Sequence, residues 1–387
     1  MIYVAKTKGV ILMTPRENLL SLLRRQGYDY IPATFSLCPS LEAEYKKQTG
    51  GKMPYQEYFS FPWKDLPDIR LDYDPDIFRP WYDSLKPGTH IGIWGTAHEP
   101  GSEAAKHMTR MRHPLSGIED LEKIKEYPFP DFKNGDASQL KQAADAIHAR
   151  GMAAVANLQC TIWEVSWYLR SMEDLFVDMM TDDPIAEFIF DKVTEQNLIR
   201  IRAAAEAGAD IVYLGDDIGM QHTAMMSHEL YRKWIKPRLK KVIAAIREIN
   251  PDALVFYHSC GMVTPFIDDL IDAGIDVLNP IQSECMNPVE IIKTYGDRLS
   301  FYGAVGTQTT MPFGTPEEII KTVHSYLDAA GPNGGMLVAP THLLEPEVPW
   351  ENILAFVEAC KTYQKKWPRG DNMPFRFSKE CRQNLTF

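Results

Sequence analysis

Short apolar runs and longer amphipathic segments alternate along the chain from about residue 150. The apolar runs are rich in β-forming residues and cover positions 152–157, 210–214, 254–257, 275–279, 299–303 and 336–339. Between them, segments such as 183–207 and 315–330 carry apolar residues at helical spacing. Repeated alternation of strands and helices predicts a parallel sheet, because parallel strands need long crossover connections.

Several of the predicted helices have clear start signals. Three starts pair a capping residue with a proline at the first helical position: Asp183-Pro184, Thr264-Pro265 and Asn287-Pro288. Thr315 and Glu318 fit a capping box, in which each side chain bonds the backbone N–H of the other residue. Gly331 and the proline after it end that helix.

The number of strands indicates the fold class. Six strand–helix units, with further strand candidates at 31–35 and 91–94, bring the count near eight. We therefore predict a (β/α)8 TIM barrel, with a doubly wound open sheet as the alternative. Neither a dinucleotide-binding glycine fingerprint nor a P-loop sequence occurs, so nothing favours nucleotide binding.

The predicted domain organisation is a single barrel with two tails. We place an N-terminal tail at 1–13, the barrel at 14–365 and a C-terminal tail at 366–387. Residues 14–135 are richer in Pro, Tyr and Trp and less regular, so we expect them to supply the first strands and an extension that covers one end of the barrel. The regular βα units then occupy 150–345.

Composition narrows the functional class. The 387 residues are 45% apolar and 24% charged, as in an ordinary globular protein. No apolar run approaches the roughly 18 residues that span a bilayer, and Lys6 and Lys8 interrupt the region where a signal core would lie, so we expect a cytoplasmic protein. A net charge of −11 disfavours nucleic acid or an anionic membrane as partner. The six cysteines lie far apart, which predicts free thiols.

Polar side chains collect at the predicted strand ends, where a parallel barrel carries its active site. They are Asn157, Gln159, Cys160 and Glu164, then Asp216 and Asp217, His258 and Cys260, Asn279 and Gln282, Thr307 and Gln308, and finally His342. From this set and the adjoining strand we predict six substrate-binding residues: Asn157, Gln159, Tyr257, Asn279, Gln282 and Gln308.

His258 and Cys260 have the spacing of two zinc ligands. Residues two apart in a strand point to the same face, and imidazole nitrogen and thiolate sulfur are the usual ligands of zinc. A buried core histidine and cysteine are the alternative. Catalytic zinc has three protein ligands and one open position, which makes His342 the predicted third ligand, with Cys160 and Cys285 as rivals.

Three carboxylates are candidates for catalysis. Glu164, Asp216 and Asp217 can transfer protons, complete a metal site or anchor its ligands. Asp216 and Asp217 can instead cap the following loop and helix, and Glu164 can be a carboxylate at an exposed helix start. For His342, the alternative role is that of a hydrogen-bonded loop histidine.

Five segments in this order resemble the uroporphyrinogen decarboxylase superfamily. They are Tyr213-Leu-Gly-Asp-Asp-Ile-Gly, Tyr257-His-Ser-Cys-Gly, Val277-Leu-Asn-Pro-Ile-Gln, Tyr302-Gly-Ala-Val-Gly and Pro312-Phe-Gly-Thr-Pro-Glu-Glu. The resemblance covers roughly residues 14–363 and implies a (β/α)8 barrel, which agrees with the prediction from periodicity.

The superfamily has two main branches. One decarboxylates uroporphyrinogen without a metal, and the other contains zinc-dependent methyltransferases that use a corrinoid on a separate protein. The H-x-C-G pattern at 258–261 resembles the second branch. In that branch a later cysteine often supplies the third ligand, whereas this chain has Thr341-His342 at the matching place, and a histidine there also resembles the decarboxylases. Decarboxylases also carry an arginine-rich segment near the N-terminus and an aspartate after an early strand. The corresponding regions here read Ile31-Pro-Ala-Thr-Phe-Ser and Ile91-Gly-Ile-Trp-Gly and contain neither feature.

The resemblance therefore implies a zinc-dependent methyltransferase. It would move a methyl group between a small methoxy, amine or thiol substrate and a corrinoid on a partner protein, because no D-x-H-x-x-G corrinoid-binding segment occurs in this chain. The alternatives are a metal-free decarboxylase and a non-catalytic partner of a corrinoid protein. A homodimer is compatible with the sequence, which does not fix the oligomeric state.

Overall fold

The computed structural model describes residues 13–101 and 109–363, which form two compact units. Unit 1 contains the described residues up to 64, residues 147–153 and the described residues from 280 onward. Unit 2 contains 65–146 and 154–279, except for the undescribed segment 102–108. The predicted tails at 1–13 and 366–387 lie outside the described residues, apart from residue 13.

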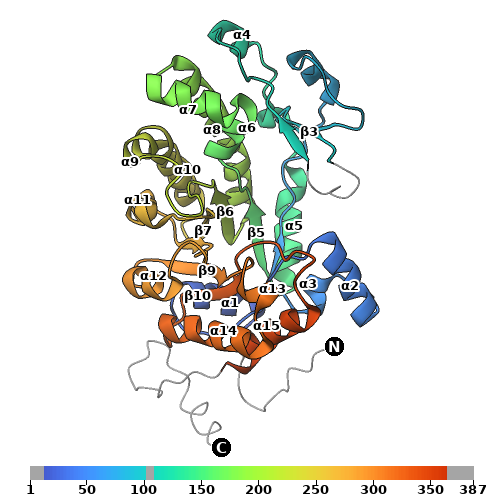
Figure 1. The fold of residues 1–387 in the computed structure, drawn as a ribbon, viewed down its shortest axis with the longest axis vertical. Helices are drawn as coiled ribbons and strands as arrows, with labels where there is room; N and C mark the ends of the chain where they lie inside the picture. Colours follow the sequence, from blue (N-terminus) through green and yellow to red (C-terminus); the bar gives the residue numbers. More distant parts are fainter. Residues whose placement is uncertain (1–12, 102–108, 364–387) are drawn as a thin grey trace, which may run out of the picture. The chain divides into compact units, whose positions relative to one another are not determined.

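Unit 2 is built on parallel strands that are apolar along almost their whole length. Strand β6 (Ile211–Gly215) pairs in parallel with β5 (Ala153–Asn157) and with β7 (Leu254–His258), and β7 pairs in parallel with β8 (Val277–Asn279). Strands β5 to β8 are almost continuously buried, which is typical of a sheet covered on both faces. Helix α10 packs against α8 and α11 on the outer side of β6 and β7 (Figure 1).

The helices of unit 2 connect these strands and cover them. They are α4 (Leu121–Lys125), α5 (Ser138–Ala149, which ends in unit 1), α6 (Trp163–Arg170), α7 (Met172–Thr181), α8 (Pro184–Ala207), α9 (His228–Leu230), α10 (Lys236–Ile249) and α11 (Ile267–Ala273). The shorter helical turns are η1 (Pro75–Trp81), η3 (Phe132–Asn134), the π-helical η4 (Tyr231–Ile235) and η5 (Thr264–Phe266).

The irregular part of unit 2 forms a second, antiparallel sheet of β2 (His90–Ile91), β3 (Ala97–Glu99) and β4 (Arg110–Arg112). The predicted barrel strand at 91–94 is therefore wrong. Gly92 and Gly95 turn the chain back there, because Gly95 N–H bonds Gly92 O and Gly95 has a φ of +83°. Alternating apolar residues predict a strand but not the direction of its pairing.

A buried ion pair ties this irregular segment to the helices. Arg170, at the end of α6, donates to Asp178 on α7 at 2.8 Å, and both side chains are less than 8% exposed. The same guanidinium donates to the backbone carbonyls of Leu115 and Ile118. Its charge and its donors are thus satisfied inside the protein, as burial of an arginine requires.

Unit 1 also combines parallel strands with helices. Strand β9 (Ser300–Val305) pairs in parallel with β10 (Met336–Pro340), and β1 (Trp63–Asp65) lies at the boundary of the unit. The helices are α1 (Pro15–Leu23), α2 (Pro39–Thr49), α3 (Tyr55–Tyr58), α12 (Pro288–Tyr295), α13 (Thr310–Phe313), α14 (Pro316–Ala330) and α15 (Trp350–Thr362). Helix α14 packs against both β9 and β10, and α15 packs against α14.

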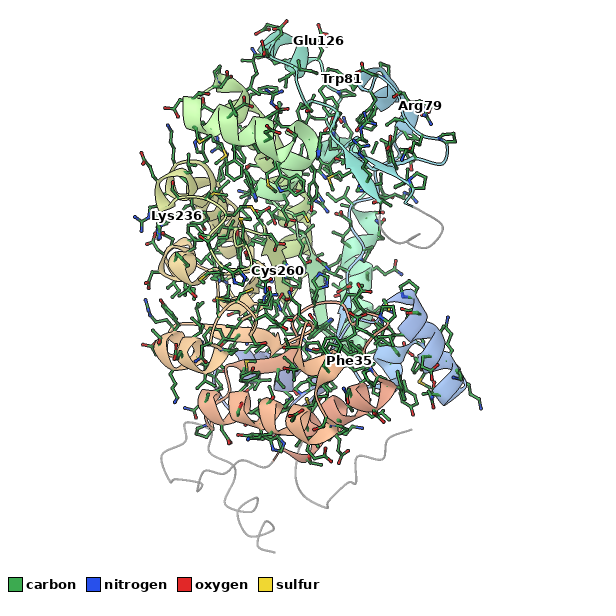
Figure 2. All side chains as sticks on the ribbon, in the orientation of Figure 1. Phe35, Arg79, Trp81, Glu126, Lys236 and Cys260 are labelled. Atoms are coloured by element: carbon green, nitrogen blue, oxygen red, sulfur yellow. The ribbon has the colours of Figure 1, made fainter. Side chains whose placement is uncertain are left out.

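The predicted strand at 31–35 is absent. Pro32 has no N–H to donate to a ladder, and a single parallel bridge between Leu37 and Leu344 is the only pairing found near it in the described chain. Phe35 instead centres an aromatic cluster, with ring centroids 5.1 Å from Phe59 and 5.4 Å from Phe61. Figure 2 shows Phe35 among the densely packed side chains of unit 1.

Most predicted helix starts are confirmed. Asp183 and Asn287 accept hydrogen bonds from the first turns of α8 and α12, and Thr315 forms a capping box with Glu318. Thr264 does not cap a helix. It begins the short turn η5, and α11 starts only at Ile267.

Strand–helix alternation with parallel pairing in both units confirms the predicted α/β class with a TIM-barrel-like sheet. All six strands predicted between residues 150 and 340 are present as β5 to β10. Among the described residues, none of the helices is both long and apolar enough to cross a membrane.

Candidate metal centre

His258 and Cys260 lie side by side at the end of β7, as their spacing predicted. The Cys260 Sγ is 3.5 Å from His258 Nε2. Strand β7 lies between β6 and β8 and brings His258 opposite Gly215 on one neighbour and Asn279 on the other. Both side chains are partly exposed, so the imidazole and the thiol are accessible at the strand end.

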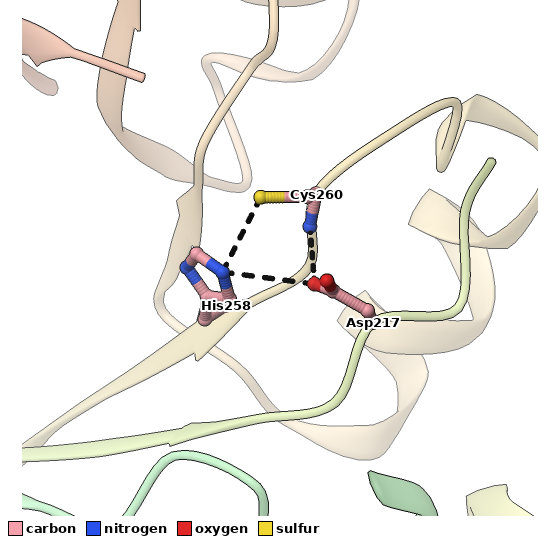
Figure 3. Close-up of side chains that lie close together, drawn as sticks. All are labelled: Asp217, His258 and Cys260. Carbon is pink, nitrogen blue, oxygen red and sulfur yellow. Dashed lines mark hydrogen bonds and ion pairs between the residues drawn. The ribbon is translucent and has the colours of Figure 1, made fainter. Parts of the chain in front are cut away.

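Asp217 completes the group from the loop after β6 (Figure 3). Its Oδ1 accepts a hydrogen bond from the Cys260 backbone N–H at 2.7 Å and lies 3.6 Å from His258 Nε2. One ligand atom from each of Asp217, His258 and Cys260 lies within 4.8 Å of the other two. This is the only group of three or more such side chains found in the described part of the chain.

Two glycines allow the loops after β6 and β7 to come this close. A Cβ at Gly219 would lie 2.7 Å from Cys260 O, and one at Gly261 would lie 2.6 Å from the Gly219 carbonyl carbon. Both contacts are to backbone atoms, which cannot move aside as a side chain can. The absence of a Cβ at both positions therefore permits the close approach of the two loops that carry Asp217 and Cys260.

The observed distances fit a tetrahedral divalent ion. With Zn–N of about 2.0 Å and Zn–S of about 2.3 Å, ligand nitrogen and sulfur atoms lie about 3.5 Å apart in a tetrahedral zinc site, and nitrogen and oxygen atoms about 3.4 Å. The corresponding distances here are 3.5 Å and 3.6 Å. One imidazole, one thiolate and one carboxylate also form a ligand set that zinc accepts, with a fourth position left for another ligand.

Asp216 has a different environment from Asp217, although the two are neighbours. Its side chain is fully buried and accepts the backbone N–H groups of Ile162 and Glu164 at 2.9–3.0 Å, at the start of α6. Burial and the nearby Glu164 carboxylate raise the pKa of Asp216 well above its usual value. Asp216 thus caps a helix, although not the following one, and this position favours a structural role over the predicted catalytic one.

Glu164 lies between Asp217 of the candidate metal site and a polar cluster that contains Tyr168 and Cys160. Its Oε1 accepts from the Tyr168 hydroxyl at 2.8 Å, and its Oε2 accepts from the Asp217 backbone N–H at 3.2 Å. Burial and the Asp217 carboxylate raise the pKa of Glu164. A raised pKa makes this carboxylate a stronger base than an exposed one, which suits the predicted proton-transfer role.

Cys160, a rival third ligand, belongs to this cluster. Its Sγ lies 3.5 Å from the Tyr168 hydroxyl, and burial and Glu164 raise the pKa of its thiol. A thiol that resists ionisation is a poor zinc ligand, since the metal binds the thiolate. The five cysteines in the described part of the chain are all free thiols, as predicted.

The other predicted ligands and substrate contacts fall in both units. His342, after β10, and Gln308 are exposed in unit 1, where Gln282 is buried and Cys285 is partly buried. Burial and Glu284 raise the pKa of the Cys285 thiol. In unit 2, Asn157 is exposed and Gln159 is partly exposed at the end of β5. Tyr257 is fully buried, which favours packing over the predicted substrate contact.

Asn279 and Tyr213 contact the imidazole from the side away from Cys260. The Asn279 Oδ1 lies 2.7 Å from His258 Nδ1, and the Tyr213 hydroxyl donates to the same oxygen. Asn279 was predicted to contact substrate, and Tyr213 was not among the predicted site residues. The strand register could have identified Tyr213. It pairs with Phe256, two residues before the Gly215–His258 pair, and therefore lies on the same face of the sheet as His258.

Residues 103–363, more than half of the chain, match the model of the uroporphyrinogen decarboxylase (URO-D) family. The chain belongs to the uroporphyrinogen decarboxylase family. The predicted superfamily is therefore confirmed.

Curated relatives of this family member include methyltransferases. The chain is 28% identical over 178 residues to the methylcobamide:CoM methyltransferase MtaA of Methanosarcina barkeri, a match that covers 46% of this chain and 49% of that protein. It is 20% identical to the methylcobamide:CoM methyltransferase MtbA of Methanosarcina acetivorans over 91% of this chain and 98% of that protein. A solved methyltransferase from Methanosarcina mazei shares the fold, with a TM-score of 0.65, 20% identity and coverage of 90% of this chain and 98% of that chain.

Proposed function

We propose that this protein is a zinc-dependent methyltransferase that moves a methyl group between a small methylated or thiol substrate and a corrinoid carried on a partner protein. The observation that carries the proposal is the convergence of Asp217, His258 and Cys260 at the adjacent ends of β6 and β7 in a member of the uroporphyrinogen decarboxylase family. The relatives named methylcobamide:CoM methyltransferases support the corrinoid part of the proposal.

His258, Cys260 and Asp217 would hold the ion through Nε2, Sγ and a carboxylate oxygen. When bound, zinc supplies a Lewis acid that polarises a substrate heteroatom or favours the thiolate form of a thiol. The exposed His342 remains the predicted further ligand, as an alternative to Asp217.

Glu164 is the proposed proton carrier. Its carboxyl group contacts the Asp217 backbone, and its pKa is raised, so it can accept the proton that a thiol substrate loses and return it to solvent. Tyr168 holds the other carboxylate oxygen and thereby fixes the orientation of Glu164.

Metal analysis tests the first half of the proposal. The native protein, purified without added metal, is compared with Cys260→Ala and with a control variant, Cys38→Ala, which removes a buried free thiol that is not a candidate ligand. We expect near-equimolar zinc in the native and Cys38→Ala proteins and little in Cys260→Ala. Absence of zinc from all three would overturn the proposal.

The second half is tested with methylcobalamin and a panel of small thiols. Transfer moves the methyl carbon from cobalt to sulfur, leaves the bonding electrons on cobalt and releases the thiol proton, so the corrinoid absorbance changes. Carbon dioxide release from uroporphyrinogen by the metal-free protein, without methyl transfer, would instead support a decarboxylase. Binding of a corrinoid protein without either reaction would support a non-catalytic partner.

A further inference from the structure

The imidazole of His258 is held by a pair of polar side chains that the proposed chemistry does not itself use. Asn279 lies opposite His258 in the β7–β8 register, and Tyr213 is two residues before Gly215, which lies opposite His258 on β6. Side chains two apart in a strand share a face, and directly paired residues share one as well. The three side chains therefore meet on one face of three adjacent strands.

The contact geometry identifies the protonated ring nitrogen. A carbonyl oxygen can only accept, so the 2.7 Å contact between Asn279 Oδ1 and His258 Nδ1 requires a proton on Nδ1. In a neutral imidazole the lone pair is then on Nε2, and this nitrogen is 3.5 Å from Cys260 Sγ and 3.6 Å from Asp217 Oδ1.

Tyr213 stabilises this orientation of the amide. Its hydroxyl donates to Asn279 Oδ1. If the amide were turned over, its NH2 group would donate to Nδ1 and to the phenol oxygen, and the proton of a neutral imidazole would lie on Nε2, which could then not bind an ion. Asn279 is 5% exposed, and its contacts are accordingly within the protein.

We propose that Asn279, supported by Tyr213, is a positioning residue that fixes the His258 tautomer and directs Nε2 toward the metal. This inference rests on the proposed function, since it assumes that His258 is a ligand. Asn279 would then act on the metal by orienting His258, as hydrogen-bond partners of metal-bound histidines do, and would not contact the substrate as predicted.

Cobalt(II) titration of the metal-free full chain tests the inference, because a thiolate and imidazole site gives this ion distinctive absorption bands. Asn279→Leu removes the acceptor at nearly constant volume, and Asn279→Asp keeps an oxygen there. We expect cobalt binding about 10–100-fold weaker in Asn279→Leu, with altered bands, and native-like binding in Asn279→Asp. Tyr213→Phe should weaken binding less than Asn279→Leu does.

Asn250→Leu is the matched control, because it also removes a polar contact in unit 2, a 3.0 Å bond to Ala209 O. It should lower stability without changing cobalt affinity. Native-like affinity and spectrum in Asn279→Leu, or an equal loss of affinity in Asn250→Leu, would overturn the inference. Asn279→Ala serves the same purpose if the leucine variant does not fold. Failure of the native protein to bind cobalt or zinc would instead overturn the proposed function.

Discussion

Replacement of Asp217 is the sharpest test of the metal centre. Asp217 is the ligand candidate that the fold adds to the His258 and Cys260 pair, and His342 is the one that the sequence favoured. The carboxylate lies 3.6 Å from His258 Nε2, close to the ligand separation in a tetrahedral site. We therefore expect Asp217→Ala to weaken zinc binding severely.

The magnitude follows from dividing the binding free energy among the ligands. Structural zinc sites bind with about 10–16 kcal/mol, so each of four ligands contributes roughly 2.5–4 kcal/mol. Loss of one corresponds to an affinity about 10²–10³-fold lower at 25 °C. Competition against a chromophoric chelator measures this difference directly.

Asp217→Asn separates two roles of the same side chain. In the native protein the Asp217 carboxylate accepts from the Cys260 backbone N–H at 2.7 Å. The amide oxygen of the variant can still accept this bond, but the negative charge that favours a divalent ion is lost. Weak binding in both Asp217 variants identifies a ligand, whereas weak binding in Asp217→Ala alone identifies a residue that only positions Cys260. Zinc affinity within threefold of native in Asp217→Ala, with a large loss in His342→Ala, would refute this reasoning.

Three further predictions concern stability, measured by urea unfolding of the metal-free protein. The pKa of Glu164 is higher in the folded protein than in the unfolded chain. Its contribution to stability is therefore present below the unfolded-state pKa and is lost as the pH rises through the folded-state pKa. Glu164→Gln should therefore lose less stability than the native protein as the pH rises from 4 to 8, and parallel losses would contradict this. Arg170→Met should lower the free energy of unfolding by about 3–5 kcal/mol, because it leaves Asp178 buried and unpaired. The double variant Arg170→Met/Asp178→Leu should recover much of this loss. A loss below about 1 kcal/mol in Arg170→Met would be inconsistent with a buried pair. Tyr257→Phe removes a buried hydroxyl without a hydrogen-bond partner among the described residues, so stability should stay constant or rise by up to about 1–3 kcal/mol, and a clear loss would show that the hydroxyl is bonded.

Local signals predicted most of the regular structure. Capping by Asp183, Asn287 and Thr315 depends on the next few residues, and the six buried strands are apolar in their own right. The same signals were insufficient at 91–94, where the pairing direction depends on the Gly92 and Gly95 turn. Thr264 failed as a cap because α11 begins later, at Ile267.

The metal centre was predictable in part for the same reason. His258 and Cys260 are two residues apart, so their shared face follows from strand geometry alone. The selection of Asp217 over Asp216 depends on the close backbone approach at Gly219 and Gly261, which joins two loops about 40 residues apart. The contact of Asn279 with His258 likewise depends on the register of β7 and β8, which no local pattern encodes.

The capping of α6 by Asp216 has a consequence for metal uptake. Because backbone N–H groups hold the Asp216 carboxylate, the peptide that leads into Asp217 is anchored before any ion arrives. An ion then meets ligands that are already arranged, and little chain entropy is lost on capture. Calorimetry of zinc uptake should accordingly give a small heat-capacity change, as expected for a preorganised centre rather than one that folds around its ion.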